Sequence, residues 1–219
     1  MDKLEAVIFD MDGVIIDSEP IHYQANLQLF KKMNIQVTRD EYEGFIGLSN
    51  TEVWSRLKEK HNLNSPVEEL VSEIVESNIK VLKGSQVEPI NGIKPLLDKL
   101  RKVKLKVALA SSSPTEYIRQ VLEKLKIKEY FETTVSGEEL KNGKPDPDIF
   151  LHTAELINVK PGNCLVIEDS ENGVKAAKAA GMKCIGYNNL NSGSQNLDNA
   201  DIIINSITEI NLNFINKLF

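Results

Sequence analysis

Two aspartates stand two positions apart at the end of a short apolar segment near the start of the chain. Residues 6–9 read Ala-Val-Ile-Phe, and Asp10, Asp12 and Gly13 follow within four positions. A short apolar run with β-branched residues predicts a buried strand, and in extended backbone residues i and i+2 point to the same side. We therefore expect both carboxylates to face one small volume, where two like charges need a cation between them or a proton on one of them. Gly13 allows a sharp turn and a close approach of a ligand to the backbone.

The same short pattern also occurs in solvated turns and in calcium-binding loops. A calcium loop would place oxygen ligands at alternating positions along its length. Counted from Asp10, the fifth and seventh positions are Val14 and Ile16, so the calcium pattern fails. The motif alone leaves a solvated turn and a functional site equally open.

Three later segments carry polar residues that could act together with the two aspartates. Ser111 and Ser112 follow an apolar run and precede a helix start, where hydroxyls and free N–H groups suit a phosphate. Lys144 stands in a stiff Lys-Pro-Asp-Pro loop, and Glu168 and Asp169 end another apolar run. Each segment has an ordinary reading, as a helix cap, a solvated lysine or acids in a turn. Their meaning depends on the elements that position them.

Apolar runs alternate with amphipathic segments after residue 86. This alternation through short turns implies a mostly parallel sheet covered by helices on both faces. We expect an α/β fold, a Rossmann-like doubly wound parallel sheet, in which ligands collect outside the carboxyl ends of the strands. Strands are predicted at 107–110, 133–135, 164–167, 184–186 and 202–204, and helices at 93–100, 113–125, 148–157, 172–180 and the carboxyl terminus.

A purely helical segment separates the first strand from the rest. Residues 17–86 show helical signals only, so we expect an inserted α-helical bundle between residues 1–16 and 87–219, which together form the α/β core. A capped helix start is predicted at Asp17-Ser18-Glu19-Pro20. Capping boxes are predicted at Thr38 with Glu41, Ser49 with Glu52, and Ser65 with Glu68.

The predicted sheet brings three acids, a hydroxyl and a lysine to one end. Each of these residues alone has an ordinary structural interpretation, but their occurrence together at one end of a sheet is much less easily attributed to chance. The chemistry that suits the whole set is phosphoryl transfer. That reaction spreads charge over three oxygens and needs positioning and cations more than covalent work. Mg²⁺ binds one or two carboxylates together with substrate phosphate and waters.

The composition of the chain argues against binding to nucleic acid or to a membrane. The net charge of −6 gives no basic footprint for a nucleic acid, and no apolar run approaches the length needed to span a bilayer. Because a strand is predicted within the first residues, we expect no signal peptide. Cys164 and Cys184 lie in apolar, strand-like runs and are expected to be buried free thiols. We expect a cytoplasmic protein.

The four segments resemble, in order, the four motifs of the haloacid dehalogenase superfamily, and the helical insert resembles that family's cap domain. The resemblance covers essentially the whole chain. It is nearest to the sugar-phosphate phosphatases and β-phosphoglucomutases. The residues that carry it are 10–14, 110–113, 143–147 and 167–170, with 12–20 and 142–147 typical of the phosphatase members.

The resemblance implies a Mg²⁺-dependent phosphatase that acts on small phosphorylated metabolites, with sugar phosphates expected. Asp10 would be the nucleophile and would form an aspartyl-phosphate. Asp12 would protonate the leaving oxygen and then activate water. Mg²⁺ would lie on Asp10, the backbone carbonyl of Asp12 and Asp169, with Glu168 beside it. A monomer is expected for a capped enzyme of this size.

The resemblance also implies substrate contacts. Ser111 and Lys144 would hold the transferring phosphoryl group, with Ser112 beside them. In the cap, His22 and the Gly47-Leu48-Ser49-Asn50 turn are candidate contacts, although a lone histidine is more often structural. The cap would close over the substrate, as lids commonly do.

Three other functions stay open. A β-phosphoglucomutase-type phosphomutase would carry Arg at the position of Asn50, and commonly Lys at that of Ile46, whereas His22 matches the mutase pattern. A phospho-aspartate switch module would place its acids on different strands and lack a cap. A dehalogenase would not use Mg²⁺ or a second aspartate, so Asp12 argues against it.

Overall fold

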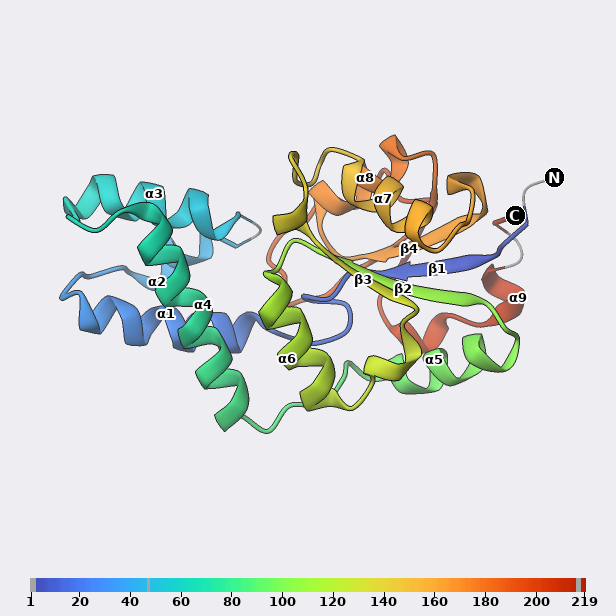
Figure 1. The fold of residues 1–219 in the computed structure, drawn as a ribbon, viewed down its shortest axis with the longest axis horizontal. Helices are drawn as coiled ribbons and strands as arrows, with labels where there is room; N and C mark the ends of the chain where they lie inside the picture. Colours follow the sequence, from blue (N-terminus) through green and yellow to red (C-terminus); the bar gives the residue numbers. More distant parts are fainter. Residues whose placement is uncertain (1–2, 47, 216–217) are drawn as a thin grey trace. The chain divides into compact units, whose positions relative to one another are not determined.

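The structure is a computed structural model that describes residues 3–46, 48–215 and 218–219. The chain forms two compact units, one made of Met1–Asp17 with Val87–Phe219 and the other of Ser18–Gln86. The larger unit contains a sheet, and the smaller unit is helical (Figure 1).

The described strands of the larger unit form a six-stranded sheet in the order β3-β2-β1-β4-β5-β6. Every neighbouring pair is parallel, which confirms the predicted α/β sheet. The strands are β1 (Ala6–Phe9), β2 (Lys106–Ser111), β3 (Thr133–Ser136), β4 (Cys164–Glu168), β5 (Lys183–Tyr187) and β6 (Ile202–Ile204).

Helices cover both faces of this sheet. Figure 1 shows α7 and α8 on one face and α5 and α6 on the other. The α-helices of this unit are α5 (Ile93–Lys102), α6 (Thr115–Leu125), α7 (Asp148–Leu156), α8 (Glu171–Ala179) and the short α9 (Leu212–Ile215). Single 3₁₀ turns lie at Lys128–Tyr130, Gly137–Glu139, Pro161–Asn163 and Ile207–Glu209.

The position of β1 at the centre explains its uninterrupted apolar sequence. All four of its residues are buried, because a central parallel strand has helices on both faces. Ile8 belongs to the buried cluster formed with Val166 of β4, Phe150 of α7 and Val174 of α8. This packing fixes the end of β1, and with it the start of the polar segment at Asp10.

The described residues of the smaller unit form four helices, as the periodic apolar positions of this segment predict. Its core contains the fully buried side chains of Trp54, Leu57, Leu70 and Ile74, so Trp54 is a core residue. The helices are α1 (Glu19–Lys32), α2 (Arg39–Glu43), α3 (Asn50–His61) and α4 (Val67–Gly84).

The helix caps of this unit are only partly as predicted. Ser49 and Glu52 form the expected capping box, and the hydroxyl of Thr38 accepts the N–H of Glu41. The predicted caps at Ser18 and Ser65 are wrong. Ser18 is the N-cap of α1 but has helical backbone angles and makes no side-chain cap bond. The N-cap of α4 is Pro66, so Ser65 stands one position too early.

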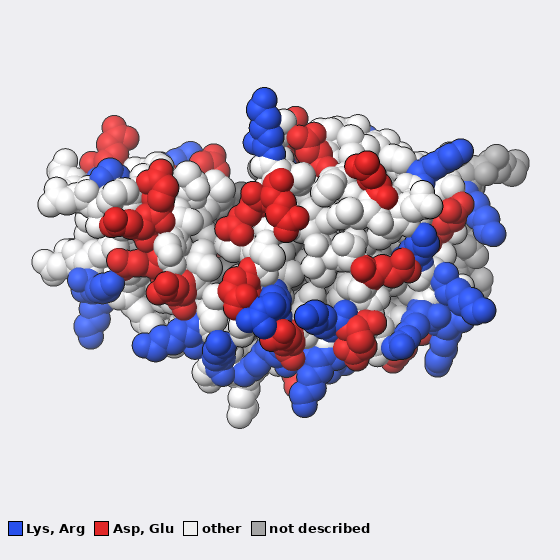
Figure 2. Space-filling view, in the orientation of Figure 1, with Lys and Arg blue, Asp and Glu red and all other residues white. Residues whose placement is uncertain are grey.

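Three expectations from composition can be compared with the structure. Cys164 and Cys184 are buried free thiols, and burial raises the pKa of Cys164 to about 12. No helix within the described residues is both long and apolar enough to cross a bilayer. On the face drawn in Figure 2, acidic and basic side chains of the described residues are interspersed rather than segregated.

Candidate active site

The register of the sheet brings three predicted site segments to one edge. Phe9, the last residue of β1, pairs with Leu109 of β2 on one side and with Ile167 of β4 on the other. Asp10 therefore leaves the sheet between the ends of β2 and β4. The N–H of Asp10 donates to the carbonyl of Ile167 at 3.0 Å, which continues the pairing by one residue.

A tight turn follows Asp10. Gly13 has a φ of +81°, a conformation that other residues rarely adopt, and its N–H donates to the carbonyl of Ile16 at 2.8 Å. A Cβ atom at Gly13 would overlap the carboxylate of Asp169. The predicted sharp turn is confirmed, and the glycine also lets the backbone of the turn approach Asp169.

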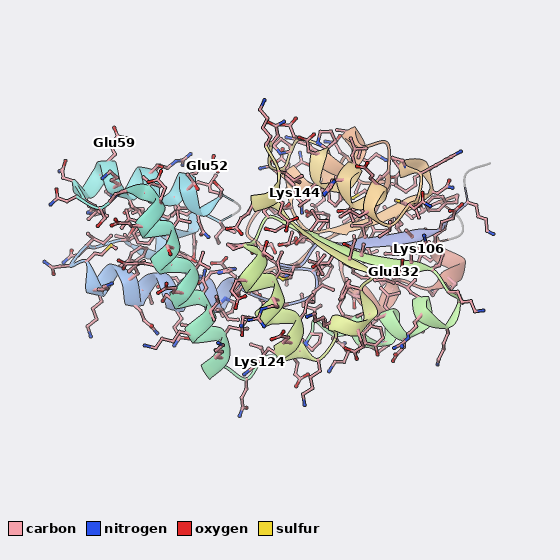
Figure 3. The ribbon with its side chains drawn as sticks, viewed as in Figure 1. Glu52, Glu59, Lys106, Lys124, Glu132 and Lys144 are labelled. Carbon is pink, nitrogen blue, oxygen red and sulfur yellow. The ribbon has the colours of Figure 1, made fainter. Side chains whose placement is uncertain are left out.

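Lys144 reaches this edge of the sheet from the loop before α7 (Figure 3). Its ammonium donates to Oδ1 of Asp10 at 2.5 Å and to Oε1 of Glu168 at 2.8 Å. It also donates to the carbonyl of Ala110 at 3.3 Å. Burial by itself would lower the pKa of Lys144, but the negative charges of Asp10 and Glu168 raise it above its usual value. Lys144 is therefore a permanent positive charge within the site.

The carboxylates of this cluster are largely out of contact with water. The side chains of Asp10 and Glu168 are 9% and 1% exposed. Burial raises the pKa of Asp10, and the charges of Glu168 and Asp12 add to that rise while Lys144 opposes it. Burial and the charges of Glu168 and Asp10 likewise raise the pKa of Asp169. The acids outnumber the lysine, and an additional cation would relieve their repulsion.

Glu168 anchors Lys144 from the opposite side to Asp10. Its Oε2 accepts the N–H groups of Asp169 and Ser170 at 2.8 Å and the hydroxyl of Ser170 at 2.9 Å. Its Oε1 faces Lys144, so both carboxylate oxygens are engaged. A Cβ at Gly173 would overlap this carboxylate, so the glycine in α8 makes room for it. Glu168, predicted beside the metal, is placed here to orient the lysine.

Asp12 points toward two serines at the end of β2, Ser111, which is the last residue of the strand, and Ser113. Its Oδ2 accepts the hydroxyl of Ser113 at 2.6 Å and that of Ser111 at 3.3 Å. The Ser111 oxygen in turn accepts the N–H of Ser113 at 3.0 Å, and Ser112 is exposed. The sequence predicts a group of hydroxyls at Ser111, Ser112 and Ser113, but three adjacent serines do not indicate that Ser113 is the one whose hydroxyl contacts Asp12 most closely.

The predicted cap residues lie in the helical unit. His22 is on α1, where its carbonyl accepts the side-chain amide of Asn26 at 2.9 Å. Asn50 is the first residue of α3. Gly47, in the turn before Asn50, lies outside the described residues. Contact of His22 or Asn50 with a substrate stays a prediction.

The predicted Mg²⁺ ligands fit a hard cation by their chemistry. Within the described residues, no three acidic, histidine or cysteine side chains gather around a common metal position. The prediction instead concerns two carboxylates, Asp10 and Asp169, and the backbone carbonyl of Asp12. Both carboxylates are buried with raised pKa values, and oxygen donors of this kind are what Mg²⁺ prefers. The Asp12 side chain is directed to the serines, and a metal-binding role for its backbone carbonyl stays a prediction.

Comparisons with known proteins show which family the chain resembles. Residues 7–187 match the family described as haloacid dehalogenase-like hydrolase. A phosphorylated carbohydrates phosphatase of Thermotoga maritima is 34% identical over 182 residues, 83% of this chain and 84% of that protein. A β-phosphoglucomutase of Bacillus subtilis is 31% identical over 220 residues, 98% and 95% of the two chains. The crystal structure of a β-phosphoglucomutase from Clostridium difficile has a TM-score of 0.83 and 30% identity, covering 98% of this chain and 96% of that one.

Proposed function

The chain belongs to the haloacid dehalogenase-like hydrolase family, and from this premise we propose that it is a Mg²⁺-dependent phosphatase of small phosphorylated metabolites. The observation that carries the proposal is the buried cluster of Asp10, Lys144 and Glu168. Asp10 and Glu168 both accept hydrogen bonds from the Lys144 ammonium, although they lie 134 and 24 residues from Lys144 in the sequence. A buried charge cluster of this kind is costly to assemble, which supports a catalytic use.

Asp10 is the proposed nucleophile. Its carboxylate would attack the phosphorus atom, forming an aspartyl-phosphate bond while the bond from phosphorus to the leaving oxygen breaks. Lys144 would hold the transferring group through its positive charge, and its bond to Asp10 favours the ionised form of that carboxylate against the rise in pKa that burial causes. Ser111 lies at the adjacent strand end, where its hydroxyl would contact the phosphoryl oxygens.

Asp12 is the proposed acid and base. The hydroxyls of Ser111 and Ser113 hold its carboxylate in one orientation, so a proton can be delivered at a fixed place to the leaving oxygen. In the second half of the reaction, Asp12 would take a proton from the water that attacks the phosphorus of the aspartyl-phosphate. The products are an alcohol and inorganic phosphate, and Asp10 is restored.

Asp10, Asp169 and the backbone carbonyl of Asp12 would hold Mg²⁺. When bound, the ion would neutralise phosphoryl oxygens and offset repulsion between the two carboxylates. Residues 18–86 would form the cap that closes over the substrate. His22 and Asn50 are the proposed cap contacts.

Sugar phosphates are the proposed substrate class. The names of the related proteins, a phosphorylated carbohydrates phosphatase and a β-phosphoglucomutase, support this choice. The second candidate is a phosphomutase, favoured by 31% identity to the Bacillus subtilis enzyme over 98% of this chain. Against it, this chain has Asn50 and Ile46 at cap positions where a mutase needs basic side chains to hold a second phosphate.

One assay separates the two candidates. Phosphate release is measured with Mg²⁺ on a panel of sugar phosphates, phosphoglycolate and nucleotides. A matched reaction supplies β-glucose 1-phosphate with a glucose bisphosphate. We expect phosphate release from a sugar phosphate and its loss in Asp10→Asn, which keeps the size of the side chain. Efficient conversion to glucose 6-phosphate would establish the mutase instead, and full activity of Asp10→Asn would refute the nucleophile.

A further inference from the structure

A loop after β5 contacts the turn that follows β1. Residues 188–195, which we call the 188–195 loop, connect β5 toward β6. The side chain of Asn189 is buried, with 9% of the residue exposed, and its amide donates to the carbonyl of Gly13 at 2.8 Å. Its Oδ1 accepts the N–H of Asn191 at 2.9 Å. Asn189 therefore joins the loop to the turn between Asp12 and Ile16.

The same loop reaches one of the proposed metal ligands. The hydroxyl of Ser192 donates to Oδ2 of Asp169 in a short hydrogen bond. A Cβ at Gly13 would overlap both that oxygen and the Ser192 hydroxyl, so Gly13, Asp169 and Ser192 meet at one point. The N–H of Ser192 donates to the carbonyl of Asn189 at 3.1 Å, which links the two contacts of the loop.

We propose that Ser192 is a positioning residue for Asp169 and that it sets the orientation in which this carboxylate meets Mg²⁺. The inference rests on the proposed function, because it gives Asp169 the role of a metal ligand. A hydrogen bond to a metal-ligating side chain fixes the orientation of that side chain, and loss of the hydrogen bond commonly weakens metal binding. The neighbouring acid, Glu168, accepts a hydrogen bond from Lys144. The hydroxyl of Ser192 is the group that donates to the Asp169 carboxylate.

The loop has other anchors, which separate this role from a purely structural one. Gln195 accepts the N–H of Glu171 at 3.0 Å and donates to the carbonyl of Ser192 at 2.9 Å. The side chain of Asn191 donates to Asp17 at 2.6 Å. With these bonds and that of Asn189 in place, loss of the Ser192 hydroxyl leaves the loop attached. The expected effect therefore falls on the carboxylate of Asp169 rather than on the fold.

The test uses Ser192→Ala with two companions in the full chain. Ser192→Thr keeps a hydroxyl at the same atom, and Ser194→Ala removes an exposed hydroxyl two positions away. Mg²⁺ affinity is measured by calorimetry without substrate. The Mg²⁺ dependence of para-nitrophenyl phosphate hydrolysis and the melting temperature of the metal-free protein are measured beside it.

We expect Ser192→Ala to weaken Mg²⁺ binding on the order of 10-fold, with the melting temperature of the metal-free protein unchanged. Ser192→Thr restores most of the affinity, and Ser194→Ala matches the wild type. Wild-type affinity in Ser192→Ala overturns the inference and leaves the phosphatase intact. A lowered melting temperature with no restoration by threonine also overturns it, because the serine would then be structural. A wild-type protein that neither binds Mg²⁺ nor releases phosphate would overturn the proposed function and the inference together.

Discussion

Replacement of Lys144 by methionine tests whether the buried charge cluster is held together as described. The substitution keeps a long apolar stem and removes the ammonium that contacts Asp10 and Glu168 at 2.5 and 2.8 Å. The three side chains are 5%, 9% and 1% exposed, so water cannot replace the lost charge. Removal of one member of a buried ion pair typically destabilises a protein by about 3–5 kcal/mol, and we expect a loss of that size at pH 10 in the metal-free protein, where Asp10 of the wild type is ionised.

The loss should depend on pH in a definite direction. Burial already raises the pKa of Asp10, and Lys144 is the group that opposes the rise, so the pKa of Asp10 climbs further in the variant. An acid with a raised pKa in the folded state binds more protons when folded than when unfolded. Stability then falls as pH rises from about 4, the pKa of an unfolded aspartate, through the folded value. Below the wild-type pKa of about 8, Asp10 is protonated in both folded proteins, so their stabilities should fall in parallel as pH rises. Above that value the stability of the wild type levels off while that of Lys144→Met continues to fall, so the variant should be furthest from the wild type near pH 10.

Urea unfolding of both proteins at pH 6 and pH 10, with a chelator present, measures this difference. Lys175→Met is the matched control, because Lys175 pairs with Glu171 on the surface, where the two side chains are 46% and 39% exposed. Such surface pairs contribute about 0–1 kcal/mol. An equal loss at both pH values would mean that Lys144 acts by packing alone. A loss no larger than that of the control would refute the buried cluster.

Two further variants test the surroundings of the cluster and the sheet edge. Gly173→Ala should destabilise the protein by about 1–3 kcal/mol through overpacking and so lower its melting temperature, because the new Cβ would overlap the Glu168 carboxylate. Gly143→Ala is the control and should melt like the wild type, because its Cβ would enter open space. The pKa of Asp201 is lowered: burial raises it, but hydrogen bonds, the first of them from Lys178, lower it more. Its contribution is present above the unfolded pKa and is lost as pH falls through the folded value. Asp201→Asn should therefore cost about 1 kcal/mol at pH 7, and the cost should disappear in acid-unfolding curves once pH falls below the folded pKa. An equal cost at all pH values would contradict this reasoning.

Most elements of the fold were predictable because the strands contain short apolar runs bounded by turn residues, as in β1 and β4. Cys164 to Ile167, for example, is buried on both faces of the sheet, so no other element suits its sequence. The helix starts were harder to predict. At Ser65, the sequence pattern of a capping box is present, but Pro66 takes the N-cap position, and the pattern alone cannot show which residue leaves the helix.

The meeting of the site segments was predictable for the same reason that the fold was. Parallel strands end at one edge, so Asp10, Ser111 and Glu168 must lie near each other once the strand order is right. The partner of each side chain was not predictable, because it depends on loop conformation. The 188–195 loop reads as a polar surface segment, and nothing in its composition distinguishes Ser192, which contacts Asp169, from the exposed Ser194.

The most direct test of the phosphatase mechanism is to locate the phosphoryl group on the chain. The Asp12→Asn variant, in which water activation should fail, is mixed with Mg²⁺ and acetyl phosphate, whose good leaving group needs no acid. The reaction is quenched in acid, and the peptides are examined by mass spectrometry. We predict one phosphoryl group on Asp10, absent when Asp10→Asn is added. A phosphoryl group on another residue, or none at all in a protein whose wild type releases phosphate, would contradict the mechanism.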